Sequence, residues 1–181
     1  MPSVISHTVV AVAAGVAFAP QDVPSRLWTV AIACSIIPDM DTIGFFFGIH
    51  YHHFFGHRGF FHSPFWAFLM SVLVVSLFFH GVKIFSARWF FYCLFFFLVS
   101  ASHGVLDAFT SGGLGIALLS PFDHTRYFFP WTPIEVSPIG IRAFFSRWGV
   151  SVIKSEFFWV WLPSFFLAIG GRFIRFMIVK Q

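Results

Sequence analysis

Charged residues are scarce in this sequence: Asp, Glu, Lys and Arg together make up 10% of its 181 residues. Ordinary globular chains contain about a quarter. Hydrophobic residues account for 58%, and 30 residues are Phe. So few charges cannot cover the surface of a soluble domain of this size. The composition therefore predicts one membrane-embedded domain over residues 1–181, with the lipid bilayer as its surroundings.

Cysteines and clusters of basic residues are also scarce. The two cysteines, Cys34 and Cys93, both fall in apolar runs, which excludes a disulfide framework and a thiolate metal site. The net charge of +4 comes from 11 basic and 7 acidic residues spread thinly along the chain. No nucleic-acid partner is therefore expected. The N-terminus lacks the basic stretch of a signal peptide, so its first apolar run is expected to be a retained helix.

Apolar runs separated by short polar turns indicate an all-α, polytopic membrane bundle of about five transmembrane helices. A hydrocarbon core about 30 Å thick needs roughly 17–25 residues per helix. Pro38 interrupts the second run, and residues 120–155, which hold four prolines but no spanning run, are expected to form a long structured loop with a short amphipathic helix near 141–153. The expected helices are Val4–Ala19, Leu27–Ile37 with an apolar continuation at Ile43–Ile49, Pro64–Phe79, Arg88–Phe109 and Phe157–Ile178.

Seven polar side chains capable of binding metal occur at the mouths of these apolar runs. Such groups are costly in or near hydrocarbon, so where they recur they usually line a site. Counting the crossings from the N-terminus puts all seven on one face of the membrane, together with the 120–155 loop. The sequence therefore predicts one metal site with these candidate ligands: His7, Asp39, Asp41, His57, His62, His103 and Asp107.

The short loops of the opposite face carry Arg26, Lys83 and Arg88. Lys and Arg are enriched in short cytoplasmic loops. We therefore expect the site to lie on the periplasmic or external face of the inner membrane.

Each motif has a simpler explanation when taken alone. His103 and Asp107 are four residues apart, so they lie on the same face of a helix. This spacing suits two metal ligands, but it also suits a polar contact with a neighbouring helix. Asp39 and Asp41 repel each other unless a cation or proton lies between them, but a solvated turn has the same pattern. The densest motif begins at His57 and ends at Ser63, and its Arg58 suits bidentate binding of phosphate.

Imidazoles and carboxylates without thiolates suit a divalent metal, with zinc favoured and manganese, iron or magnesium as alternatives. Seven groups exceed the three protein ligands of an ordinary catalytic zinc, so one or two ions are expected. Two ions would activate a water and clamp a phosphoryl oxygen. Ser63 belongs to no nucleophile motif. The remaining histidines are expected in surface loops: His50, His52, His53, His80 and His124.

The order of these motifs resembles the YdjM family of inner-membrane, predicted metal-dependent hydrolases. The resemblance rests on His7, on Pro38-Asp39-x-Asp41, on His57-Arg58-Gly59-x-x-His62-Ser63 and on His103-x-x-x-Asp107, and it covers residues 3–129. It implies a membrane-bound hydrolase, with a distant relation to zinc-dependent phospholipase C and P1-type nucleases, which use a helical fold and His/Asp metal clusters.

The leading hypothesis is a metal-dependent hydrolase that cleaves a phosphoester of a phospholipid-like, amphiphilic substrate. Asp39, Asp41, Arg58 and Glu135 are the candidate catalytic residues, although Glu135 is also consistent with a plain loop carboxylate. Ser63, Arg58 and Arg126 are the candidate substrate-binding residues. The alternatives are a metal-ion or proton-coupled transporter and a protein with a purely structural metal. The absence of an inverted repeat in the sequence argues against a transporter.

Overall fold

The computed structural model describes residues 1–20 and 22–179, and within these residues the chain is helical, with no strands. Two isolated bridges, Thr110 with Ile134 and Ile116 with Tyr127, tie the loop that follows α4. The all-α prediction is therefore confirmed. The α-helices are α1 (Val4–Phe18), α2 (Arg26–Ile36), α3 (Pro64–Phe78), α4 (Ala87–Ala108), α5 (Ile141–Phe144), α6 (Arg147–Glu156) and α7 (Leu162–Val179); η1 (Ile37–Phe47) and η2 (Phe60–His62) are 3-10 helices, and η3 (Phe157–Trp161) is a π-helical turn.

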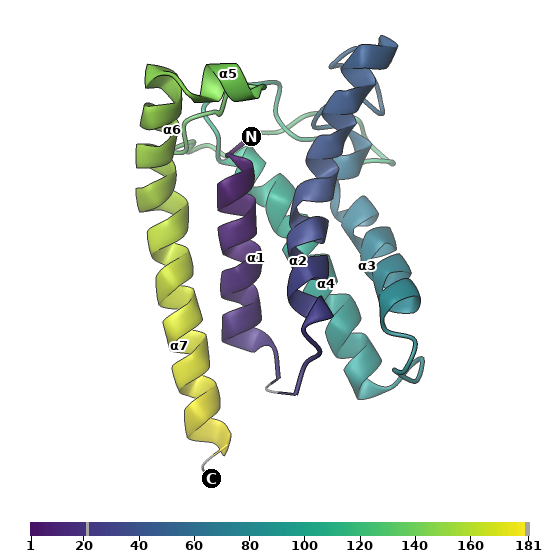
Figure 1. Ribbon diagram of the computed structural model, residues 1–181. Helices are drawn as coiled ribbons and strands as arrows, with labels where there is room; N and C mark the ends of the chain where they lie inside the picture. The colour runs from purple at the N-terminus through teal and green to yellow at the C-terminus, as the bar shows by residue number, and fades with distance from the viewer. Residues whose placement is uncertain (21, 180–181) are drawn as a thin grey trace.

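The helices run side by side and alternate in direction, as expected of a polytopic membrane bundle (Figure 1). Three helical stretches are long and apolar enough to cross a membrane: Arg26–Phe47, Ala87–Ala108 and Arg147–Ile178. Two further apolar helices, Val4–Phe18 and Pro64–Phe78, have 15 residues each. At about 1.5 Å per residue they are shorter than the hydrocarbon core.

Two helix boundaries differ from the expected ones. Pro38 does not break the second helix, because the backbone changes there from α to 3-10 geometry and continues as η1 to Phe47. The amphipathic helix expected near 141–153 is present as α5 and α6, but α6 continues into the last apolar helix, so that the last span begins at Arg147 rather than Phe157. Because α6 contains several polar residues, hydropathy did not indicate that it belongs to the last spanning helix. Ser146 caps α6 by accepting a hydrogen bond from the Trp148 N–H, 3.2 Å away.

The buried apolar core lies between α1, α2, α3 and α4, and includes Ala11, Leu27, Val75 and Phe96. The outer faces of the same helices expose large apolar side chains, among them Phe18, Leu73 and Leu94. An apolar exterior around an apolar core suits lipid as solvent. The loop after α4, together with α5, covers the end of the bundle where α1 begins and η1 and α4 end (Figure 1).

The alternating helices predict that Ser25 and Lys83 lie on one side of the membrane and His124 on the other. We expect an impermeant maleimide to label Ser25→Cys and Lys83→Cys from the same side, and His124→Cys only from the opposite side. The variants are built on a Cys34→Ala, Cys93→Ala background. Labelling of Ser25→Cys and His124→Cys from one side would contradict the fold.

Candidate metal centre

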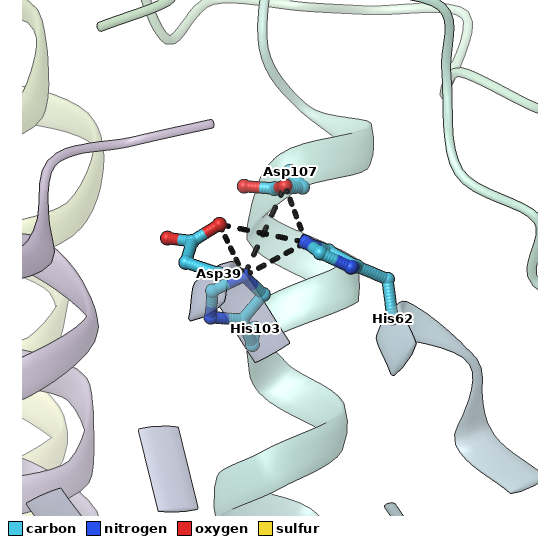
Figure 2. A group of neighbouring side chains, drawn as sticks. All are labelled: Asp39, His62, His103 and Asp107. Carbon is cyan, nitrogen blue, oxygen red and sulfur yellow. Dashed lines mark hydrogen bonds and ion pairs between the residues drawn. The ribbon is translucent and has the colours of Figure 1, made fainter. Parts of the chain in front are cut away.

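Four side chains from three helical elements meet at the loop-covered end of the bundle. Asp39 comes from η1, His62 from η2, and His103 and Asp107 from one face of α4 (Figure 2). One ligand atom from each lies within 4.8 Å of the others. All four are buried, with Asp39 the most exposed at 7%. These four side chains are called the inner cluster below, and they are positioned to hold a metal ion.

Four of the five known distances between the ligand atoms are close to the edge length of a small tetrahedron. The two imidazole Nε2 atoms lie 3.1 Å apart. Asp39 Oδ1 lies 3.2 Å from His103 Nε2 and 3.5 Å from His62 Nε2. Asp107 Oδ2 lies 3.5 Å from His62 Nε2 and 4.0 Å from His103 Nε2. Ligands bound to tetrahedral zinc at about 2.0–2.1 Å would be about 3.3–3.4 Å apart, so the inner cluster fits one ion of this size.

The inner cluster also contains buried charge that the described residues do not neutralise by hydrogen bonding. Both carboxylate oxygens of Asp39 and both of Asp107 are buried without a hydrogen-bond partner among the described residues. Burial of an unpaired carboxylate is strongly unfavourable. These oxygens, together with the two Nε2 atoms facing them, form a donor set that could hold a divalent cation.

Backbone contacts orient His103 toward the centre. Its Nδ1 lies 2.7 Å from the carbonyl oxygen of Ser35, on α2. A carbonyl can only accept, so Nδ1 carries the hydrogen and Nε2 is left with its lone pair facing the inner cluster. A histidine held in this way through its second nitrogen is typical of metal ligands.

Asp41 lies behind His62 rather than in the inner cluster. Its Oδ2 is 3.2 Å from His62 Nδ1, and its Oδ1 is 2.7 Å from His57 Nδ1. The Arg58 backbone N–H donates to Oδ2 at 3.2 Å. Asp41, His57 and His62 form a second group that could hold an ion, but it shares His62 with the first.

The pKa values of the two histidines of this second group are shifted in opposite directions. Burial lowers the pKa of His62, but its contacts with the carboxylates of Asp39 and Asp41 outweigh burial and raise that pKa to about 9. Burial lowers the pKa of His57, and the contact with Asp41 offsets only part of the effect. A metal ion bound at the inner cluster would compete with a proton for the Nε2 atom of His62.

His7, on α1, lies at the rim of the inner cluster. Its ring stacks on His103, with centroids 3.8 Å apart and planes at 14°. Its Nε2 is 3.7 Å from Asp107 Oδ1, and neither ring nitrogen has a hydrogen-bond partner among the described residues. His7 is thus adjacent to the centre but outside the group of four.

Arg58 is fully buried, and its guanidinium joins the loop after α4 to the inner cluster. Nη1 donates to the Gly112 carbonyl at 2.7 Å and Nη2 to Thr110 Oγ1 at 2.8 Å. Nε lies 3.4 Å from Asp107 Oδ2. The backbone of Arg58 has a positive φ of 66°. Gly113 leaves room for this side chain, because a Cβ there would lie 2.6 Å from Nη1.

The other predicted catalytic and substrate-binding residues make contacts outside the inner cluster. Arg126 donates to the carbonyl oxygens of His57 and Tyr51, each at 2.8 Å. Ser63 caps α3 by accepting from the Trp66 N–H at 3.1 Å. Glu135 accepts a hydrogen bond from Ser151 on α6. The five remaining histidines are exposed, as expected: His50, His52, His53, His80 and His124.

The sequence analysis missed Glu156, a fully buried carboxylate in the last spanning stretch. It accepts hydrogen bonds from the Ser3 hydroxyl at 2.6 Å, from the Ser6 hydroxyl at 2.7 Å and from the Ser3 backbone N–H. These bonds fix the first turn of α1, which carries His7. The feature of the sequence that could have indicated Glu156 is its position as an acidic residue immediately before the apolar run that starts at Phe157.

Gly104 lets α4 approach His62 closely. A Cβ at Gly104 would lie 2.3 Å from the His62 carbonyl oxygen. Gly104→Ala must therefore push His62 away by about 0.7 Å to reach a 3.0 Å contact, and functional constellations tolerate about 0.5 Å. We expect metal affinity to fall at least about tenfold by titration calorimetry. The control is Gly170→Ala on α7, where a Cβ meets no atom within 4 Å. Equal affinity in both variants would contradict this geometry.

Comparison with known proteins agrees with the helical membrane architecture. The family model described as "YdjM inner membrane protein" matches residues 1–179. "Inner membrane protein YbcI" of Escherichia coli (strain K12) is 38% identical over 172 residues, which cover 92% of this chain and 95% of that protein. No solved structure matches the chain significantly. Both matches support an inner-membrane location. The chain belongs to the YdjM family of inner membrane proteins.

Proposed function

We propose that this protein is a metal-dependent hydrolase that cleaves a phosphoester of an amphiphilic substrate at the membrane face. One observation carries the proposal: four buried ligand atoms lie within 4.8 Å of one another, and the carboxylate oxygens among them lack hydrogen-bond partners among the described residues. The donor set contains only nitrogen and oxygen, which suits zinc first, and manganese, iron or magnesium as alternatives.

In this proposal Asp39, His62, His103 and Asp107 hold the ion. When bound, a divalent ion supplies Lewis acidity toward a phosphoryl oxygen and an attacking water. His7 keeps its ring parallel to that of His103 and offers one further nitrogen at the rim. Asp41 is an orienting carboxylate for His62 and His57, because each of its oxygens already faces one of these rings. One ion, rather than two, follows from this assignment.

His57 is the candidate proton acceptor. Its Nδ1 faces Asp41 Oδ1, so the hydrogen resides on Nδ1 and Nε2 keeps a free lone pair. A carboxylate that orients an imidazole in this way is the arrangement found in many general bases. Tyr51 and Phe45 pack edge-on against the ring and restrict its rotation.

Arg58 is the candidate group for holding an anionic phosphoryl oxygen, because its guanidinium is next to Asp107 and has more N–H groups than its protein partners use. Arg126 holds the loop that carries Tyr51 and His57, which is a positioning role. Ser63 caps α3 and Glu135 is hydrogen-bonded to Ser151 of α6, and these contacts favour structural roles for both residues.

We propose further that the inner cluster faces the periplasm. Arg26, Lys83 and Arg88 lie in or beside the short turns at the opposite end of the bundle, which the positive-inside rule assigns to the cytoplasm.

Metal analysis of purified protein tests the assignment of ligands. We expect about one ion per chain in the wild type, and loss of that ion in Asp39→Asn, because the inner cluster loses a charged ligand. Asp41→Asn should keep the site but bind about 10–100-fold more weakly, as expected for an orienting carboxylate. Asp123→Asn, a loop carboxylate bonded to Thr125, is the control. Two ions per chain, with loss of one in Asp41→Asn, would indicate a two-metal site instead.

A hydrolysis panel of phosphomonoesters, phosphodiesters and phospholipids tests the activity. We expect metal-dependent turnover that Asp39→Asn abolishes and that His57→Gln lowers by about 10²–10⁴-fold, because the glutamine cannot accept the proton. Bound metal without turnover on any substrate, combined with metal flux in proteoliposomes, would overturn the hydrolase and favour the transporter.

A further inference from the structure

A cavity of about 320 Å³, with several polar and charged side chains in its wall, adjoins the inner cluster. His57 and Arg58 form part of its wall, and each is in direct contact with a carboxylate of the site, Asp41 and Asp107 respectively. Tyr51 and Ser137 also line it, and Gly113 keeps it open beside the Arg58 guanidinium. A cavity with a buried cation in its wall and no carboxylate among its lining residues suits an anionic group.

An apolar groove of about 280 Å³ continues from this cavity. Val4 and Ile5 of α1 form one side, and Ile141, Phe144 and Phe145, in and just after α5, form the other. Ser137 and Pro138 line both the cavity and the groove, so the two hollows share a wall. The volume of the groove is just below the range for ligand pockets, roughly 300–1,000 Å³, which suits part of one acyl chain.

We propose that the cavity and the groove together form a bipartite cleft for a phosphorylated, acyl-chain amphiphile. The phosphate head lies against Arg58 and Tyr51, and the first part of one acyl chain lies between α1 and α5. The inference rests on the proposed function for the reaction, and adds to it the position of the phosphate and of one acyl chain and the residues that bind them.

The larger apolar grooves of the bundle lack this combination. The groove between α1 and α7, of about 580 Å³, is lined by residues such as Val12, Trp161 and Phe165, with no charged residue. The groove between α1 and α4, of about 370 Å³, is lined only by apolar residues and Ser102. Such surfaces accept any lipid chain. Of these three grooves, the one at α5 lies beside a cationic group of the candidate site.

Photocrosslinking tests the cleft without requiring turnover. The probes are a monoacylglycerol phosphate with a diazirine on its acyl chain and the matching neutral monoacylglycerol. On full-length, metal-loaded protein, we expect saturable crosslinks of the phosphate probe to residues 137–145. The neutral probe should bind at least about tenfold more weakly, because it lacks a charged partner for Arg58. Inorganic phosphate should compete with the phosphate probe.

Two variants on the same helix provide the matched comparison. Ile5→Trp fills the groove at α5 and should lower the crosslinking several-fold. Val12→Trp, two turns further along the same face of α1, fills the α1–α7 groove and should leave it unchanged. Retained metal binding in both variants serves as the folding control.

Three results would overturn the cleft: labelling that does not saturate, equal labelling by the neutral probe, or labelling unaffected by Ile5→Trp. Saturable labelling without hydrolysis of any phosphoester would leave the cleft standing and remove the proposed reaction. Hydrolysis without labelling of residues 137–145 would support the proposed reaction and overturn the cleft.

Discussion

The rest of the site depends on the confinement of two aspartates, Asp39 and Asp107, in a buried pocket with two histidines. Four carboxylate oxygens there lack hydrogen-bond partners among the described residues, and a buried charge needs a counter-charge. Arg58 lies beside Asp107 and His62 lies beside both carboxylates, and a divalent ion held by the four side chains would supply further positive charge. The need for a cation therefore links the fold to the proposed chemistry.

The surrounding structure holds these groups in place from several directions. The Ser35 carbonyl fixes His103, and Asp41 faces His62 from behind. Arg58 connects Asp107 to the loop after α4. Glu156 fixes the start of α1 and thereby the position of His7. Each of these supports comes from a different part of the chain, so the site depends on packing of the whole bundle.

Much of this arrangement was predictable from the sequence because helix crossings alternate. The apolar runs gave the helices, and counting them put the polar residues at one end. The sequence could not separate the inner cluster from Asp41 and His57, since side-chain direction decides that, and both Asp39 and Asp41 lie in the same 3-10 helix. The role of Glu156 was equally hidden, because its partners Ser3 and Ser6 are about 150 residues away in sequence.

The continuity of α6 with the last span was missed for a different reason. The polar residues of α6 include Ser151, Lys154 and Glu156, so the segment lacks the continuous apolar character by which a span is recognised. In the structure these residues belong to the half of the last helix that lies beside the covering loop, where Ser151 and Ser155 bond Glu135. The hydropathy of a segment indicates whether a helix is surrounded by lipid or by water. It does not indicate that one part of a helix packs against a protein loop, as α6 does here.

The most direct test of the inner cluster is X-ray absorption spectroscopy of the zinc-loaded protein. The account predicts four nitrogen or oxygen ligands at about 2.0–2.1 Å, with the outer-shell scattering of imidazole rings. Asp39→Asn should abolish that spectrum, and Asp123→Asn should preserve it. A sulfur ligand at about 2.3 Å, or a shell without imidazole scattering, would contradict the assignment of Asp39, His62, His103 and Asp107.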